Sequence, residues 1–112
     1  MVRENLSLER GDIVWIDFSP TKGREQSGLR PAVVISPLKY NSLTGLVLVC
    51  PLTTKSKKYF FEVAVLGPKG KSFVLVDQMR SMDVKERVKK QTGAISQNEL
   101  SEMMARISVL FQ

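Results

Sequence analysis

The chain contains no histidine and only one cysteine, Cys50. Structural and catalytic zinc sites are built chiefly from these two residue types, so their scarcity argues against a zinc site. Histidine is also the commonest general acid and base at neutral pH. We therefore expect any catalysis to use carboxylates, arginine, lysine or hydroxyl groups, with no metal ion and no cofactor.

Long hydrophobic runs are absent too. No apolar stretch approaches the roughly 20 residues that span a bilayer, so no membrane partner is expected. A single cysteine cannot form a disulfide within the chain, and no apolar leader segment stands near the N-terminus. These features favour a reducing, cytoplasmic location. The 112 residues, of which 43% are hydrophobic, predict one domain spanning residues 1–112.

Acidic residues are outnumbered by basic ones. The chain has 11 Asp and Glu against 17 Lys and Arg, which gives a net charge of +6. A surplus of this size on a small domain favours a polyanionic partner such as nucleic acid. A merely soluble basic protein is the alternative, and charge alone does not separate the two.

Runs of β-branched and aromatic residues predict a mainly β protein. In residues 12–18 the two faces of one strand alternate. One face carries Val14, Ile16 and Phe18, which we expect in the core, and the other carries Ile13, Trp15 and Asp17. Further strands are expected over residues 32–36, 46–52, 59–66 and 72–76. Pro51 should mark a strand end or a sheet edge, because proline cannot donate to a ladder.

The C-terminal segment predicts an α-helix. Ser96 and Glu99 have the spacing of a capping box. Behind them an apolar stripe recurs at helical spacing, formed by Leu100, Met103, Met104, Ile107, Leu110 and Phe111. Such a stripe is expected to pack onto the sheet. The predicted fold is therefore mainly β (α+β): a small curled antiparallel sheet or barrel of about five strands, with a covering C-terminal helix.

A long loop, residues 19–31, precedes the second strand, and loops of this length in small domains are often functional. Arg30 precedes Pro31, which keeps Arg30 extended where the loop joins the strand. A guanidinium held there suits a phosphate, although a surface ion pair is an equal alternative. Glu25 in the same loop is a candidate general base or a loop-ordering ion-pair partner.

Hydroxyl groups end the strand over residues 46–52. Thr53 and Thr54 are followed closely by three lysines, Lys55, Lys57 and Lys58. Together they suit a phosphate or a transition state, and a threonine-rich turn with solvated lysines is the alternative. Asp77 and Gln78 follow the last strand and are expected to reach the same end of the sheet.

Aromatic and basic side chains suggest two further nucleic-acid contacts. Stacking faces for unpaired bases are offered by Tyr40, Tyr59, Phe60 and Phe61, although core packing is expected for at least two of them. A second basic surface is expected from Arg80, Lys85, Arg87, Lys89 and Lys90.

Four sequence blocks carry a family resemblance. They are Gly11–Pro20 (G-D-x-V-W-x-D-F-x-P), Gly23–Ser36 with its R-P-A-V-V-I-S end, Pro51–Thr54 and Val76–Ser81. In this order and spacing the chain resembles the MazF/PemK toxins along nearly its whole length. The resemblance implies an SH3-like curled sheet, a homodimer and a sequence-specific endoribonuclease, or mRNA interferase, that stops translation. It also implies a cognate acidic antitoxin, with promoter DNA bound only by the toxin–antitoxin complex.

The resemblance also assigns roles to residues. It implies that Arg30 and Thr53 are catalytic and that Glu25 is the base. The expected RNA-binding residues are Lys22, Arg24, Gln26, Thr54, Lys55, Lys57, Lys58, Asp77, Gln78 and Arg80. Leu29 stands where some relatives have histidine, and Leu75 stands where others have arginine, so Arg30 is left as the main cationic catalyst.

The predicted chemistry uses the RNA as its own nucleophile. The 2′-OH attacks the neighbouring phosphorus, which yields a 2′,3′-cyclic phosphate and a 5′-OH end without a metal-bound water. Two alternatives remain at this stage. One is a non-catalytic SH3-like module that binds nucleic acid through its basic face. The other is a toxin of the same architecture that poisons DNA gyrase, because fold alone does not fix function.

Overall fold

The structure is a computed structural model that describes residues 7–19, 23 and 28–112. Its first half contains strands β1 (Asp12–Asp17), β2 (Leu29–Val34) and β3 (Leu46–Thr53), with helix α1 (Leu38–Thr44) between β2 and β3. Its second half contains β4 (Glu62–Gly67), β5 (Gly70–Leu75), the 3₁₀ turn η1 (Val76–Gln78), β6 (Arg80–Asp83), α2 (Val84–Arg87), β7 (Val88–Ala94) and α3 (Gln97–Val109).

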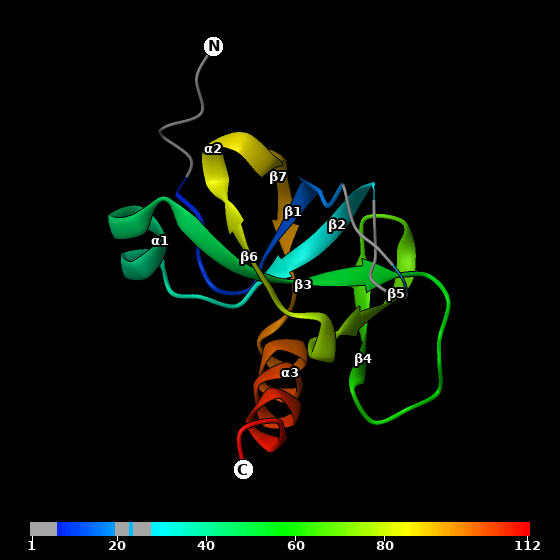
Figure 1. The fold of residues 1–112 in the computed structure, drawn as a ribbon. Coiled ribbons are helices and arrows are strands. Elements are labelled where there is room, and N and C mark those ends of the chain that lie inside the picture. Colours follow the sequence, from blue (N-terminus) through cyan, green and yellow to red (C-terminus); the bar gives the residue numbers. More distant parts are fainter. Residues whose placement is uncertain (1–6, 20–22, 24–27) are drawn as a thin grey trace.

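The strands form one curled, antiparallel sheet. The strand order is β4-β5-β3-β2-β1-β7, and β6 pairs with β3 outside this path. β3 is therefore shared: its first half pairs with β6, and its last residues pair with β5. The β4–β5 hairpin leaves the rest of the sheet at the end of β3, and α3 lies beneath the sheet (Figure 1). The predicted class, a mainly β curled antiparallel sheet with a C-terminal helix, is confirmed.

The sheet has an apolar core on each face. The first cluster includes Ile13, Val33 and Cys50 and is covered by Met103 and Ile107 of α3. The second cluster includes Val14, Ile16, Phe18 and their neighbours on β2, β3 and β6. The alternation predicted for residues 12–18 is confirmed, since Val14, Ile16 and Phe18 pack together and Ile13 faces the opposite core.

Helix α3 begins with the predicted capping box. The amide of Glu99 donates to the Ser96 hydroxyl at 3.1 Å, and the Glu99 carboxylate accepts from the amide of Ser96 at 2.8 Å. The C-terminal end of the predicted apolar stripe does not pack onto the sheet as expected, because Leu110 and Phe111 are exposed. Along the described part of the chain, no helix is long and apolar enough to cross a bilayer.

Three sequence expectations need correction. The sheet has seven strands rather than about five, because β6 and β7 carry polar and basic residues without apolar alternation. The strand expected from Tyr59 begins only at Glu62. Pro51 lies inside β3, at the point where the neighbouring strand changes from β6, last paired at Val49, to β5, first paired at Leu52. A residue without an N–H is tolerated in that interruption.

A buried polar network fixes α1 against the sheet. The Ser36 hydroxyl donates to Asn41 Oδ1 at 2.5 Å and accepts from the amide of Leu48 at 3.0 Å. Asn41 Nδ2 donates to the carbonyls of Leu8 at 2.8 Å and Ser36 at 3.1 Å. Asn41 is 6% exposed, so water cannot replace these bonds freely.

We predict that Asn41→Ala lowers the free energy of unfolding by about 2–4 kcal/mol, because it leaves several buried groups without partners. Ser42→Ala, an exposed substitution on the same helix, should change it by less than about 0.5 kcal/mol. Urea unfolding of both variants measures the difference. Equal losses would show that the network contributes nothing specific.

Candidate active site

The candidate site lies where β2 and β3 part. The ladder between them ends at the pair Ala32–Pro51. Continued by two residues, the same register would place Arg30 opposite Thr53. Instead that ladder stops: Thr53 pairs with Phe73 of β5 on the other edge of β3, and Arg30 stays on β1, paired with Ile16. The two strands therefore open into a cleft with Arg30 on one side and Thr53 on the other.

The cleft has two lobes that share Arg30, Thr53 and Thr54. The first, which we call the hairpin lobe, is completed by Leu29, Pro31, Leu52, Lys69 and Ser72. The second, the loop lobe, is completed by Lys55, Ser56 and Lys57. Arg30 and Thr53 are half-buried, whereas the three loop-lobe side chains are exposed. A guanidinium, hydroxyls and ammonium groups thus surround one hollow, which suits a phosphodiester.

The base of the loop before Arg30 is held by a polar clamp. The amide of Phe18 donates to the carbonyl of Gly28 at 2.9 Å, and the amide of Gly28 donates to the Ser19 hydroxyl at 3.1 Å. Arg87 donates to the carbonyls of Ser19 and Asp17. The Ser19 amide donates to the Asp17 carboxylate and, as the main cause, lowers the pKa of Asp17. These contacts fix the backbone at Gly28, two residues before Arg30.

Four predicted site residues fall outside the described residues. They are Lys22, Arg24, Glu25 and Gln26.

The loop lobe is shaped by a buried carboxylate. Glu62 is 8% exposed and accepts hydrogen bonds from the Ser56 hydroxyl and, at 2.7 Å, from the amide of Lys57. Burial by itself would raise the pKa of the Glu62 carboxyl. The hydrogen bonds from Ser56, Lys57 and the Lys58 amide outweigh burial, so this pKa lies below its ordinary value. Lys58 has a φ of 54°, a left-handed conformation that costs roughly 1–2 kcal/mol in a non-glycine residue.

Asp77, Gln78 and Arg80 do not line the cleft. The Tyr59 hydroxyl donates to Asp77 Oδ1 at 2.6 Å, and burial together with this bond raises the pKa of Tyr59. Arg80 pairs with Val49 in the ladder and lies over the Phe18 ring, at 5.5 Å from its centroid. Lys58 is exposed on the same loop as Lys57 but also lies outside the cleft lining.

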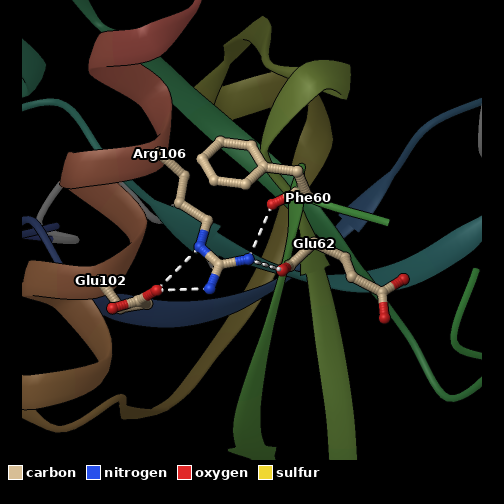
Figure 2. Close-up of polar contacts among 4 residues, drawn as sticks. All are labelled: Phe60, Glu62, Glu102 and Arg106. Carbon is tan, nitrogen blue, oxygen red and sulfur yellow. Dashed lines mark hydrogen bonds and ion pairs between the residues drawn. The ribbon is translucent and has the colours of Figure 1, made fainter. Parts of the chain in front are cut away.

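The expected second basic surface is divided. Arg87 donates into the polar clamp, Arg80 lies on Phe18, and Lys89 Nζ donates to the carbonyl of Glu86 at 3.1 Å. Among the expected stacking residues, Phe60 lies under the guanidinium of Arg106 (Figure 2), at 4.9 Å from the ring centroid. Phe61 packs against the first core. Arg80, Arg87 and Lys89 thus make contacts with three different parts of the chain.

Sequence reasoning missed Ser56, Ser72 and Lys69 in the cleft lining, and Glu62, which holds the loop lobe. Lys69 sits in the tight turn between β4 and β5, with Nζ 5.5 Å from the centroid of the Trp15 ring, and it lines the hairpin lobe. Nothing in the sequence separates it from any turn lysine. Glu62 could have been noticed only as an acidic residue between Phe61 and Val63, which are apolar.

Residues 9–111 match the family model described as PemK-like, MazF-like toxin of type II toxin-antitoxin system. The chain belongs to this family. It is 45% identical over 102 residues to the endoribonuclease toxin MazF of Escherichia coli K12, covering 91% of this chain and 92% of that one. The resemblance inferred from the four sequence blocks is thereby confirmed.

Solved structures agree with the family assignment. A crystal structure of MazF from Deinococcus radiodurans superposes with a TM-score of 0.83 at 36% identity, over 95% of this chain and 97% of that chain. A MazE–MazF structure from the same organism gives a TM-score of 0.75 at 33% identity, over 95% and 96% of the two chains. This MazF/PemK family member is therefore similar to both structures in sequence and in fold.

We predict that Glu62 makes stability depend on pH in the acidic range. A lowered native pKa means that the carboxylate stabilises the fold above the unfolded glutamate pKa of about 4.3. This contribution to stability is lost as the pH falls through the pKa that Glu62 has in the folded protein. Urea unfolding between pH 7 and pH 3 should therefore show a smaller acid loss for Glu62→Gln than for wild type.

Glu86→Gln, which alters an exposed glutamate on α2, provides the control and should follow the wild-type curve. Parallel curves for wild type and Glu62→Gln would show that the carboxylate has no such role.

Proposed function

We propose that this toxin, a homodimer in the cytoplasm, cuts single-stranded messenger RNA at specific sequences in the cleft between β2 and β3, without a metal ion. The endoribonuclease activity itself follows from family membership and from 45% identity to an endoribonuclease toxin. The parted strands support the location of the reaction, because Arg30 and Thr53 line the same hollow there.

The chemistry starts at the 2′-OH of the RNA. Its oxygen bonds to the adjacent phosphorus as the bond from phosphorus to the 5′-oxygen breaks, and the 5′-oxygen takes up a proton from water, giving a 2′,3′-cyclic phosphate and a 5′-OH. We assign removal of the 2′-OH proton to Glu25. Arg30 stabilises the charge that develops on the phosphorane, because a guanidinium is a poor proton donor at neutral pH. Thr53 orients the phosphate by a hydrogen bond.

The lysines on both lobes extend the site along the RNA. Lys55 and Lys57 stand on one side of the shared wall, and Lys69 stands on the other. With the cleaved phosphate at Arg30 and Thr53, the neighbouring phosphates lie beside these ammonium groups. Thr54 in the shared wall adds a further hydroxyl. Lys58, Asp77, Gln78 and Arg80 then act outside the cleft, on more distant parts of the RNA.

The partners follow from charge and exposed apolar surface. MazE–MazF structures of the relative, together with the net charge of +6 here, support a cognate acidic antitoxin. Leu110 and Phe111, exposed at the end of α3, support burial against a second copy of this chain. Promoter DNA is assigned only to the toxin–antitoxin complex.

The central prediction concerns cleavage of a long single-stranded RNA in EDTA. Wild type should give discrete fragments that end in 2′,3′-cyclic phosphate and 5′-OH. Arg30→Ala and Thr53→Ala should each lose about 10²–10³-fold in rate, because each removes a donor aimed at the transition state. Thr53→Ser keeps the hydroxyl and should retain most of the activity. Gel separation and mass spectrometry of the ends provide the measurement.

Other results of this assay would contradict the proposal in specific ways. Ends with 3′-OH and 5′-phosphate would exclude attack by the 2′-OH. Intact RNA with a salt-dependent gel shift would indicate a non-catalytic binding module. If circular dichroism shows that Arg30→Ala is unfolded, Arg30 is a structural residue.

A matched pair of lysines tests the hairpin lobe. Lys69 lines it, whereas Lys71 lies two residues further along the hairpin, beside Phe73 and outside the cleft lining. The test uses a single-stranded RNA with 2′-fluoro groups, because an RNA without 2′-OH groups cannot be cut by 2′-OH attack. Lys69→Ala should bind this RNA more weakly than wild type does. The slope of log affinity against log salt should fall by about 0.7, the value for one phosphate contact on a single strand. Equal behaviour of Lys71→Ala would refute a specific role for Lys69.

A further inference from the structure

The first half of the loop between β3 and β4, residues 54–58, carries the loop-lobe lysines, and all five of its residues are polar and exposed. Thr53 Oγ1 accepts from the amide of Lys55 at 3.2 Å, so the loop is joined directly to a proposed catalytic hydroxyl. A flexible loop in this place would have to be ordered each time RNA binds, at a cost in affinity.

The loop is ordered instead from its inner side, by Glu62. The Ser56 hydroxyl and the Lys57 and Lys58 amides all donate to its carboxylate. Ser56 Oγ also accepts from the Lys58 amide at 3.0 Å. Successive amides in a right-handed then left-handed turn form an anion-binding hollow, and the positive φ of Lys58 fits that geometry. Here the anion is supplied by the chain itself.

Glu62 is in turn held by α3. Arg106 Nη1 donates to the carbonyls of Phe60 at 2.8 Å and Glu62 at 3.1 Å, and its guanidinium lies over the Phe60 ring (Figure 2). Glu102, one turn earlier on α3, accepts from Arg106 Nε at 2.7 Å and so fixes the guanidinium. Figure 2 shows the Glu62 carboxylate pointing away from Arg106, so the two residues are joined through the backbone of β4.

We propose that Glu62 is a positioning residue for RNA binding, and that Arg106 anchors it to α3. The proposal rests on the proposed function of the cleft. With the carboxylate in place, the loop presents Lys55 and Lys57 toward the wall formed by Arg30 and Thr53. Without it, the Ser56 hydroxyl and the Lys57 amide lose their acceptor, Lys58 is free to leave its left-handed conformation, and the lysines must be ordered by the RNA.

The direction in which the Kd for RNA changes distinguishes a positioning role of Glu62 from a purely electrostatic one. Glu62→Gln removes a negative charge close to Lys57, which by itself would tighten binding of a polyanion. Loss of loop order would weaken it. We expect the Kd for single-stranded 2′-fluoro RNA to rise about 3–10-fold in Glu62→Gln, the effect of immobilising one or two long side chains on binding. KM for RNA cleavage should rise similarly, with kcat within about twofold.

Two further variants complete the test. Arg106→Gln should weaken binding in the same direction as Glu62→Gln. Ser96→Ala removes the cap of α3 and lowers stability without touching the loop, so its Kd should equal that of wild type. Amide hydrogen exchange at Lys57 and Lys58 should speed up in Glu62→Gln and stay unchanged in Ser96→Ala.

An unchanged or lower Kd in Glu62→Gln, or unchanged exchange at Lys57 and Lys58, would overturn the proposal. If Glu62→Gln fails to fold, the surface pair Ser56→Ala and Ser56→Thr decides, since only the first loses the hydroxyl that donates to Glu62. Binding and exchange do not require turnover. Wild type that binds RNA without cutting it would therefore refute the proposed function while these two readouts still test the role of Glu62.

Discussion

The site depends on one feature of the sheet: the ladder between β2 and β3 stops before either strand ends. Its last pair is Ala32–Pro51, whereas β3 continues to Thr53 along β5 on its other edge, and β2 reaches back to Leu29 along β1. Pro31 and Pro51 lie at this division, where backbone donors are not needed for a continuous ladder. The strands therefore separate where their register would have joined Arg30 to Thr53. Groups that would have been neighbours on a closed sheet become the two walls of a cleft.

Rigid polar contacts on both sides keep this opening in shape. On the β2 side, Ser19 and Arg87 clamp the chain just before the loop that leads to Arg30. On the β3 side, Glu62 and Arg106 hold the loop that follows Thr53. These contacts are hydrogen bonds to backbone groups or buried carboxylates, which fix geometry better than exposed ion pairs do. A basic cleft with ordered walls can bind a phosphodiester without first reorganising.

Sequence reasoning succeeded at several places where the signal was local. Alternation over residues 12–18 assigned side chains to the correct faces, and the Ser96–Glu99 spacing located the start of α3. Arg30, Thr53, Thr54, Lys55 and Lys57 were all selected from their positions beside prolines and strand ends, and the structure places them around one cleft.

The remaining features depend on distant parts of the chain. β6 and β7 escaped detection because strands with exposed faces need no apolar alternation. Lys69 reaches the cleft only through the length of the β4–β5 hairpin, and Glu62 is buried only because the loop folds over it. Arg80 and Arg87 were expected on one basic surface, but they make tertiary contacts with Phe18 and Ser19, which no local signal indicates.

The central claim is that the RNA phosphate binds where β2 and β3 part. An NMR titration of the ¹⁵N-labelled protein with single-stranded 2′-fluoro RNA tests it most directly, because each backbone amide reports its own surroundings. The account predicts the largest shifts at Leu29, Arg30 and Thr53 to Lys57, with smaller ones at Lys69. Shifts confined to Lys85, Lys89 and Lys90 on α2 and β7, with the cleft unchanged, would contradict it.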